Sequence, residues 1–247
     1  MLRQFFDKNP KVALAFSGGV DSAYLLYAAK AFGADVQAYY VKTSFQPAFE
    51  QEDALRLAWE LGAEVKVIDL DVLSDIQIAE NPKNRCYFCK KRIFTAILQQ
   101  AEADGYSLII DGTNASDDAA DRPGMVALKE LKVRSPLREC GLTKAEIRRL
   151  SKEAGLFTHN KPAYACLATR IPAGTPITAE KLAITERSEA FLRQLGFSDF
   201  RIRLMGTSAK LQISEKEIPL LLANRETILN RLKIDYTEVL LDLEVRQ

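Results

Sequence analysis

The chain has 247 residues, 47% of them hydrophobic, so it can bury a sizeable core in one large or two smaller domains. Its 34 Lys and Arg nearly balance 33 Asp and Glu, which argues against a partner bound mainly through phosphate neutralisation, such as long nucleic acid. No apolar run could span a bilayer and the N-terminus lacks a signal-peptide core, so we expect a cytoplasmic protein without membrane contact.

The first distinctive stretch is a glycine-rich turn after a short apolar run at residues 12–16. The run predicts a buried strand, and Ser17-Gly18-Gly19-Val20-Asp21-Ser22 leads from it into a helix that begins near Asp21. Glycines allow a sharp turn and close approach of a ligand. The first N–H groups of a helix lack partners and carry its positive dipole end, so phosphate is their natural occupant.

The spacing of this turn is neither that of a Walker A loop nor that of the dinucleotide fingerprint. It looks like the SGGxDS motif of the PP-loop ATP pyrophosphatases, in which the loop holds the pyrophosphate end of ATP. An ordinary glycine turn is the alternative. The strand before and the helix after supply the structural context that favours the nucleotide interpretation.

Strands and helices then alternate. We expect a helix at 23–32, a strand at 36–41, a helix at 48–61 and a strand at 65–70. This alternation predicts an α/β fold, a doubly wound parallel sheet with helices on both faces. Ligands of such sheets bind beyond the carboxyl ends of the strands, where the glycine turn would lie.

Two cysteines, Cys86 and Cys89, stand at C-x-x-C spacing at the start of a helix that should run to about residue 103. Two thiolates so spaced can meet one metal or cluster, and a helix N-terminus lowers thiol pKa. The pair could equally be redox-active or half of a zinc site. His159 is the only histidine, which excludes a multi-histidine metal site.

A fourth strand is expected at 108–114, and its end should share the sheet edge with the glycine turn. Asp111, Gly112 and Asn114 are therefore placed to face ATP. The acidic residues that follow, Asp117, Asp118 and Asp121, are interpreted mostly as a solvated loop.

Thr143 and Glu146 form a capping-box pattern for a helix that ends at Gly155. Cys140, just before it, is interpreted as a small loop residue. A loop at 160–174 follows and carries Cys166, Thr169 and Arg170. Arg170 can fork onto a phosphate or a carboxylate. A loop that simply joins two domains is the alternative, and such loops often form a wall of a site.

Beyond it we expect a helix at 178–195, strands at 200–204 and 209–214, one helix at about 215–232 and a last strand at 237–243. This predicts a smaller C-terminal α+β domain with a mixed sheet. The predicted ranges are 1–158 for the nucleotide domain, 159–177 for the linker and 178–247 for the small domain. Arg201 and Arg203 would face the same way and could bind one phosphate, although spacing alone favours a solvated strand face.

The ordered set of motifs resembles the LarE family over nearly the whole chain. The set comprises SGGVDS, the Arg-Cys-Tyr-Phe-Cys-Lys run at 85–90, Asp111-Gly112 with Asp121-Arg122-Pro123-Gly124, the Ala165–Arg170 loop and Arg201-Ile202-Arg203. These are ATP-dependent sulfur transferases that act in synthesis of the nickel-pincer nucleotide, the cofactor of lactate racemase.

The resemblance implies that ATP adenylates a carboxylate of a pyridinium-3,5-dicarboxylate mononucleotide and releases pyrophosphate. A sulfur nucleophile then displaces AMP and leaves a thiocarboxylate, and a second round treats the other carboxylate. It also implies a homohexamer with a small-molecule nucleotide as substrate.

The same resemblance assigns residues. Pyrophosphate and Mg²⁺ are held by Ser17, Gly18, Gly19, Asp21 and Ser22. Sulfur is supplied through Cys166, with Asp21 and Arg170 as further catalytic residues. The substrate phosphate is held by Thr169, Arg170, Glu189, Arg201 and Arg203. Thr169 stands where the family usually has serine.

The sulfur source divides the family. One branch lacks the C-x-x-C pair and consumes its single cysteine, which becomes dehydroalanine. A chain with Cys86, Cys89 and Cys166 resembles the branch in which three thiolates hold a 4Fe–4S cluster whose fourth iron carries a labile sulfide. We favour the cluster; consumption of Cys166, a zinc site and unused thiols are the alternatives.

Three other functions stay open. A tRNA thiolase of the same superfamily would usually show a basic RNA-binding surface or an appended RNA domain, and neither is evident. An amide-forming synthetase would leave the cysteines unexplained. A nucleotide-binding module would bind ATP without releasing pyrophosphate.

Overall fold

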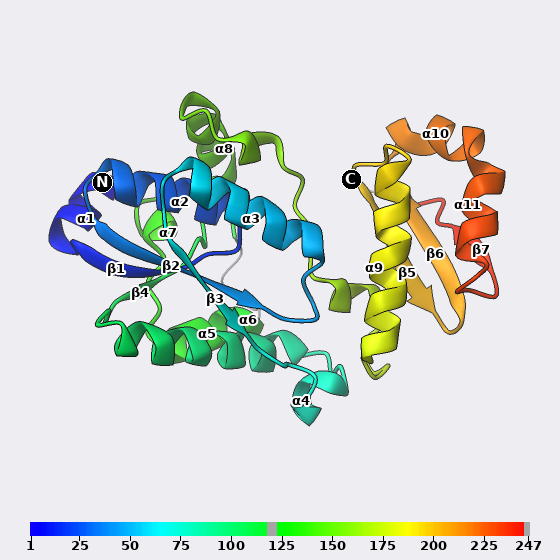
Figure 1. Cartoon of the computed structure of the whole chain (residues 1–247), viewed down its shortest axis with the longest axis horizontal. Helices are drawn as coiled ribbons and strands as arrows, with labels where there is room; N and C mark the ends of the chain where they lie inside the picture. Colours follow the sequence, from blue (N-terminus) through cyan, green and yellow to red (C-terminus); the bar gives the residue numbers. More distant parts are fainter. Residues whose placement is uncertain (118–122, 245–247) are drawn as a thin grey trace. The chain divides into compact units, whose positions relative to one another are not determined.

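The structure is a computed structural model that describes residues 1–117 and 123–244 (Figure 1). It divides into two compact units. Unit 1 comprises Met1–Val72 and Asn84–Ala163, and unit 2 comprises Leu73–Lys83 and Tyr164–Gln247. The predicted ranges 1–158, 159–177 and 178–247 stay predictions, since compactness alone does not define a domain.

Unit 1 is built on a four-stranded sheet in the order β3-β2-β1-β4, and every pair of neighbours is parallel. The strands are β1 (Lys11–Ala15), β2 (Asp35–Lys42), β3 (Val65–Asp69) and β4 (Ile109–Ile110). Val12 to Leu14 are wholly buried, as expected of a central strand covered on both faces. The predicted parallel α/β sheet is confirmed.

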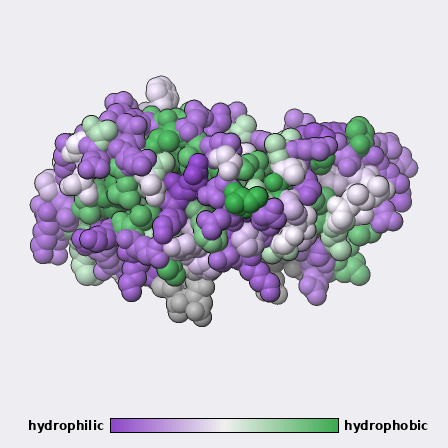
Figure 2. Space-filling view, turned by 90° about the horizontal axis from the view of Figure 1, so that it is seen from below, coloured by the Kyte–Doolittle hydropathy of each residue, from purple (hydrophilic) through white to green (hydrophobic). Residues whose placement is uncertain are grey.

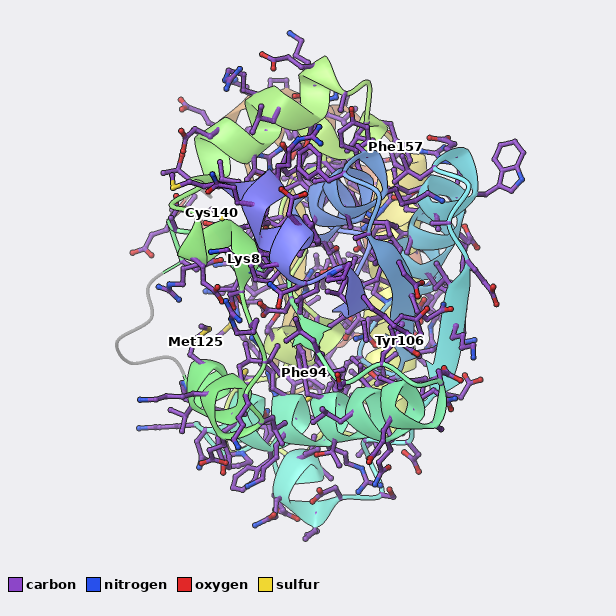
Figure 3. The ribbon with its side chains drawn as sticks, turned by 90° about the vertical axis from the view of Figure 1, so that its left-hand side faces the viewer. Lys8, Phe94, Tyr106, Met125, Cys140 and Phe157 are labelled. Carbon is purple, nitrogen blue, oxygen red and sulfur yellow. The ribbon has the colours of Figure 1, made fainter. Side chains whose placement is uncertain are left out.

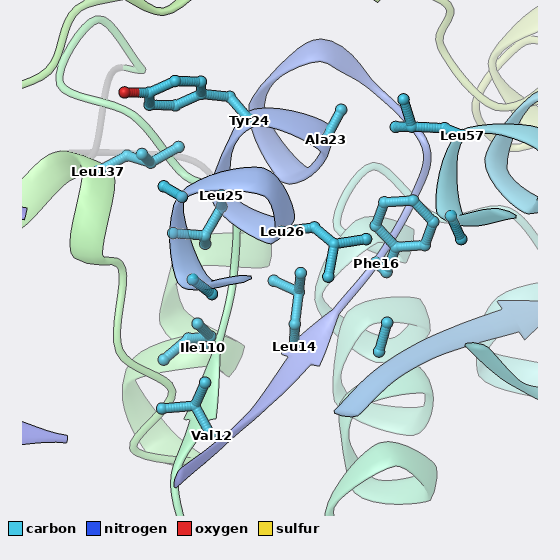
Figure 4. Close-up of a cluster of buried hydrophobic side chains, with 14 of the residues drawn as sticks. Val12, Leu14, Phe16, Ala23, Tyr24, Leu25, Leu26, Leu57, Ile110 and Leu137 are labelled. Carbon is cyan, nitrogen blue, oxygen red and sulfur yellow. The ribbon is translucent and has the colours of Figure 1, made fainter. Parts of the chain in front are cut away.

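One face of this sheet is covered by α1 (Leu2–Lys8), α2 (Val20–Ala31), α3 (Ala48–Glu60), α7 (Pro136–Glu139) and α8 (Lys144–Glu153). Figure 4 shows the resulting core, in which Leu14 and Phe16 of the β1 segment pack with Leu26 of α2 and Leu57 of α3. Burial of such side chains contributes about 1.5–3 kcal/mol each. This core supports the glycine turn directly, because the turn connects β1 to α2.

The opposite face is covered by α5 (Arg85–Ala103) and α6 (Pro123–Glu130). Phe94 of α5 lies on the side of that helix that faces the sheet (Figure 3) and packs in one cluster with Ala13 and Tyr39. Helices on both faces make the sheet doubly wound, as the sequence predicts.

Several elements of unit 1 differ from the prediction. Helices α1 and α6 are additional, and β4 is two residues long instead of reaching 114. The strand stops because the Asp111 carboxylate accepts bonds from the N–H and the hydroxyl of Thr113, which turns the chain. The capping box of Thr143 and Glu146 is confirmed at the start of α8.

Unit 2 has a three-stranded mixed sheet in the order β5-β6-β7, with β5–β6 antiparallel and β6–β7 parallel. The strands are β5 (Phe200–Met205), β6 (Ser208–Ile213) and β7 (Val239–Leu241), and α9 (Ala179–Gln194) packs against them. The predicted small mixed sheet is confirmed.

The single helix predicted at 215–232 is wrong. A 3₁₀ turn (Glu215–Glu217) leads into α10 (Ile218–Ala223), and α11 (Arg225–Leu232) follows after Asn224. The Asn224 side chain donates to the Leu220 carbonyl oxygen at 2.9 Å. Asparagine competes in this way with the helical hydrogen bonds, which explains the break.

The segment Leu73–Lys83, with the short helix α4 (Ile76–Ala79), belongs to unit 2. Buried Asn81 ties it there, because its amide donates to the carbonyl oxygens of Ile171, Pro172 and Thr175.

Across residues 1–117 and 123–244 no helix has the length and apolar character that crossing a membrane requires. The face of the molecule in Figure 2 shows hydrophilic residues interspersed with smaller hydrophobic groups.

Candidate active site

The glycine turn of unit 1 passes directly over α3. Gly18 has a φ of +72°, and a Cβ placed on it would lie 2.5 Å from Cβ of Ala54. Only glycine fits there without strain or collision. Gly19 is the N-cap of α2 and has no side chain to cap the helix. The first-turn N–H groups therefore point to a place where an anion can bind.

Two serines close the turn on itself. The hydroxyl oxygens of Ser17 and Ser22 lie 3.1 Å apart, and the Ser22 hydroxyl also donates to the Gly19 carbonyl oxygen at 3.2 Å. The Ser17 N–H donates to the Ser22 oxygen at 3.3 Å. Ser22 is buried and Ser17 is exposed. The turn is thus shaped before any ligand arrives, with one hydroxyl left at the surface.

Asp21 lies in the first turn of α2 and pairs with Lys144. The Lys144 ammonium donates to Oδ2 of Asp21 at 2.6 Å. The other oxygen, Oδ1, is buried and has no hydrogen-bond partner among the described residues. Burial raises the pKa of Asp21 above its ordinary value. The charge and hydrogen bond of Lys144 and the Asn114 amide lower this pKa in part, and the negative charge of Asp117 raises it further. Sequence reasoning missed Lys144, although the capping box just before it marks where α8 begins.

The end of β4 meets the start of α2. A Cβ on Gly112 would lie 2.8 Å from the Ser22 nitrogen, so only glycine permits this approach. Asp111 is 6% exposed, and its carboxylate accepts from the hydroxyls of Ser135 at 2.7 Å and Thr113 at 2.5 Å. The structure therefore places Asp111 as an internal support of this edge. Asp118, Asp121 and Arg122 lie outside the described residues.

The C-x-x-C pair lies in the first turns of α5. Cys86 is exposed and Cys89 is half-buried, and neither forms a disulfide. The buried Arg85 guanidinium contacts the Cys86 sulfur at 3.9 Å. Tyr87 donates to Glu130 of α6 at 2.8 Å, which fixes the start of α5 against that helix. The two thiols are thus presented on one side of a helix N-terminus.

Cys166 lies in unit 2, as the N-cap of the 3₁₀ turn Leu167–Arg170. Its carbonyl oxygen accepts from the Thr169 hydroxyl at 2.8 Å and from the Thr169 N–H at 3.0 Å. The thiol is half-buried. Thr169 therefore shapes the turn that carries the cysteine, a role that serine at this place could also fill. Within residues 1–117 and 123–244, no three side chains of the types His, Cys, Asp and Glu already gather as a metal site.

A buried ion pair supports the Cys166 turn. Nε and Nη2 of Arg170 donate to the two carboxylate oxygens of Glu189 at 2.7 and 3.1 Å. Glu189 also accepts from the Tyr164 hydroxyl at 2.6 Å and from the Ile202 N–H at 3.1 Å. Both Arg170 and Glu189 are 1% exposed. Burial raises the pKa of Tyr164, so the phenol stays protonated as a donor. The sequence indicated that Arg170 could fork onto a carboxylate, but not which one.

Arg201 and Arg203 are half-buried on the same face of β5. The Arg203 guanidinium donates to the Thr169 carbonyl oxygen at 2.9 Å and to the Gln212 side chain. The solvated strand face that spacing favoured is therefore wrong for Arg203. Unit 2 brings Thr169, Arg170, Glu189 and Arg203 together around the Cys166 turn.

Two further residues considered in the sequence, Asn114 and Cys140, have structural surroundings. Asn114 is buried and its Oδ1 accepts from the Ser116 N–H, which shapes the loop beside Asp21. Cys140, labelled in Figure 3, ends α7 and packs at the margin of the first core cluster; burial raises the pKa of its thiol. Its interpretation as a small loop residue agrees with this place.

The chain is similar to several known proteins. The family profile described as queuosine biosynthesis protein QueC matches residues 11–85. An uncharacterized protein of Synechocystis is 37% identical over 220 residues, 88% of this chain and 81% of that protein. The pyridinium-3,5-bisthiocarboxylic acid mononucleotide synthase of Lactiplantibacillus plantarum is 34% identical over 236 residues, 94% and 86% of the two chains. The tRNA-specific 2-thiouridylase MnmA of Pseudothermotoga lettingae is 28% identical over 187 residues, 61% and 54% of the two chains.

Proposed function

The chain belongs to the LarE-type family of pyridinium-3,5-bisthiocarboxylic acid mononucleotide synthases, and from this we propose that it is an ATP-dependent sulfur transferase acting on a pyridinium-3,5-dicarboxylate mononucleotide. The observation that carries the proposal is similarity to the named synthase along 94% of the chain. The local geometry of both units supports it, since unit 1 offers an anion-binding turn and unit 2 a cysteine on a rigidly held turn.

The nucleotide half of the reaction is proposed for unit 1. The uncapped N–H groups at the start of α2, with Gly18, Gly19 and the Ser17 hydroxyl, would hold the pyrophosphate end of ATP. A substrate carboxylate oxygen attacks the α-phosphorus, and the bond to the β-phosphate oxygen breaks, so that pyrophosphate leaves with the electron pair. The turn stabilises the charge that develops on this leaving group.

Asp21 fits a magnesium ligand. Its Oδ1 is a buried carboxylate oxygen without a hydrogen bond among the described residues, and Mg²⁺ prefers such oxygens. Bound Mg²⁺ would neutralise phosphate charge. Because Asp111 is engaged by Thr113 and Ser135, its proposed part at the nucleotide is to hold the Gly112 backbone beside α2.

The sulfur half is proposed for Cys166. If the Cys166 thiolate is the nucleophile, it attacks the carbonyl carbon of the acyl adenylate, the bond to the AMP oxygen breaks, and a thioester forms. Loss of the Cα proton and cleavage of the Cβ–S bond would then release the thiocarboxylate and leave dehydroalanine at position 166. If a sulfide delivered at Cys166 is the nucleophile, displacement of AMP gives the thiocarboxylate directly. Arg170 and Glu189 hold the turn from inside, whereas Arg201 and Arg203 lie at the face of β5 where a substrate phosphate could bind bidentately. Thr169 would join this phosphate site through its hydroxyl.

Cys86, Cys89 and Cys166 fit an iron–sulfur cluster by the chemistry of their donors, since thiolates are its usual ligands. Bound by these three residues, a 4Fe–4S cluster would supply a labile sulfide for transfer. Consumption of Cys166 itself is the competing source. A cytoplasmic homohexamer completes the proposal, on the strength of the family resemblance.

The test is pyrophosphate release, measured without oxygen with and without the pyridinium substrate. Release that requires the substrate supports adenylation of its carboxylate. Release that requires tRNA instead would favour a tRNA thiolase, and ATP binding without any release would favour a nucleotide-binding module.

The sulfur source is tested by metal and sulfide analysis of protein purified without oxygen. About four irons per chain, lost in Cys86→Ala but kept in Cys140→Ala, would support the cluster. An iron-free protein that thiolates substrate once and then lacks the sulfur of Cys166 by mass would show consumption.

A further inference from the structure

The proposed nucleotide turn contains an electrostatic conflict. Asp21 is the second residue of α2, in the same first turn whose N–H groups would receive the phosphates. A carboxylate there suits the helix dipole, but it repels an incoming polyanion. The turn therefore needs a cation beside Asp21 before ATP can bind well.

In this structure the cation is the ammonium of Lys144, 2.6 Å from Oδ2 of Asp21. Lys144 is the first residue of α8, and two sets of hydrogen bonds hold its backbone in position. The capping box of Thr143 and Glu146 sets the helix start, and the Lys144 N–H donates to the Ser116 hydroxyl at 3.0 Å. A rigid backbone thus delivers a flexible side chain to the turn.

The geometry leaves both groups able to change partners. The Asp21 oxygen Oδ1 is buried and has no hydrogen-bond partner among the described residues, so it has a lone pair to offer a cation that reaches it. The Lys144 side chain is 35% exposed, so its ammonium is not enclosed by protein. An ammonium on a four-carbon stem can turn by a few ångströms at little cost.

We propose that Lys144 is a nucleotide-contacting residue that neutralises Asp21 in the empty turn and moves onto the phosphates when Mg²⁺ takes over Asp21. The inference rests on the proposed function only in that the turn must bind ATP. The ammonium lies beside the first turn of α2, so an anion on those N–H groups is within its reach. One lysine thereby serves both the empty and the occupied turn.

The experiment is titration calorimetry of ATP with the full-length chain, once with Mg²⁺ and once with EDTA. Lys144→Gln is compared with Lys152→Gln, a matched control on the exposed face of the same helix. Lys144→Gln is expected to weaken Mg–ATP binding at least tenfold, because the phosphate contact is lost. It should weaken ATP binding in EDTA even more, because Asp21 is then uncompensated. Lys152→Gln should bind as the wild type does.

Asp21→Asn gives an independent readout that does not require a stable lysine variant. Without the carboxylate, Lys144 is already available and the repulsion is gone. ATP in EDTA should therefore bind several-fold more tightly than to the wild type, and Mg²⁺ should add little. If the ion pair between Asp21 and Lys144 were merely structural, Asp21→Asn would instead lower the melting temperature and leave the affinity for ATP unchanged.

The inference is overturned if Lys144→Gln binds Mg–ATP like the wild type, if Lys152→Gln loses as much, or if Asp21→Asn binds ATP in EDTA no better than the wild type. Failure of the proposed function looks different: the wild type then binds Mg–ATP with this dependence on Lys144 but forms no thiocarboxylate. A wild type that binds no ATP would refute both.

Discussion

Replacing Glu189 by glutamine tests whether the buried ion pair supports the Cys166 turn. The carboxylate accepts two bonds from Arg170, one from Tyr164 and one from the Ile202 N–H, and the Arg170 side chain is 0% exposed. Glutamine keeps the shape but removes the charge, which leaves the guanidinium buried without a counter-ion. Breaking a buried pair in this way costs about 3–5 kcal/mol, so we expect a loss of that size in the free energy of unfolding.

The assay is urea unfolding of the full chain followed by circular dichroism, with hydrogen exchange to localise the effect. Exchange should accelerate in α9 and in residues 164–171. Tyr164→Phe is the milder companion, because it removes one bond to the carboxylate and should cost about 1.5–3 kcal/mol. Arg170→Met combined with Glu189→Leu removes both charges and should be less destabilised than Glu189→Gln.

The reasoning would be refuted if Glu189→Gln lost under 1 kcal/mol and only raised the KM for the mononucleotide. Glu189 would then act on the substrate, as the family resemblance alone implies, and not through Arg170.

Three further predictions follow from single residues. Gly18→Ala should lower the free energy of unfolding of unit 1 by about 2–5 kcal/mol, of which about 1–2 comes from its positive φ and about 1–3 from collision with Ala54. Gly33 also has a positive φ but has open space around it, so Gly33→Ala should cost only about 1–2 kcal/mol in urea unfolding. Cys166→Ser should abolish thiocarboxylate formation, measured by mass spectrometry, while Cys140→Ser leaves it intact. Hydrogen bonds from Arg187 and Arg231 lower the pKa of Asp235 below its ordinary 3.8; the stability they supply is present above that pH and is lost as pH falls through the lowered pKa. Asp235→Asn should therefore be less stable than the wild type at pH 7 and should show a smaller loss between about pH 5 and 2 in urea unfolding.

The parts of the fold that sequence reasoning found are those set by local rules. The strand, turn and helix around Gly18 follow from apolar runs and glycine chemistry within a dozen residues. The start of α8 follows from a capping box. A local rule with two meanings does not decide between them: proline interrupts chains, but it also suits the first position of a helix, and Pro123 begins α6, a helix that no periodic pattern predicts.

The site itself depends on pairings that no local pattern contains. Lys144 lies 123 positions after Asp21, and Glu189 lies 19 positions after Arg170. Asp111 shows a related failure. A carboxylate at a strand end is typical of a ligand contact, yet its burial against Thr113 and Ser135 makes it a support of the turn. Charge and position could not distinguish the two, because the difference lies in which partners the fold brings close.

The most direct test of sulfur transfer is product analysis by mass spectrometry. Full-length protein prepared without oxygen is mixed with ATP, Mg²⁺, sulfide and pyridinium-3,5-dicarboxylate mononucleotide, and the nucleotide products are identified. We predict that sulfur replaces a carboxylate oxygen, that AMP and pyrophosphate appear in equal amounts with each replacement, and that Cys166→Ser forms no sulfur product. AMP and pyrophosphate without sulfur in the mononucleotide, or sulfur transfer that is independent of ATP, would contradict the account.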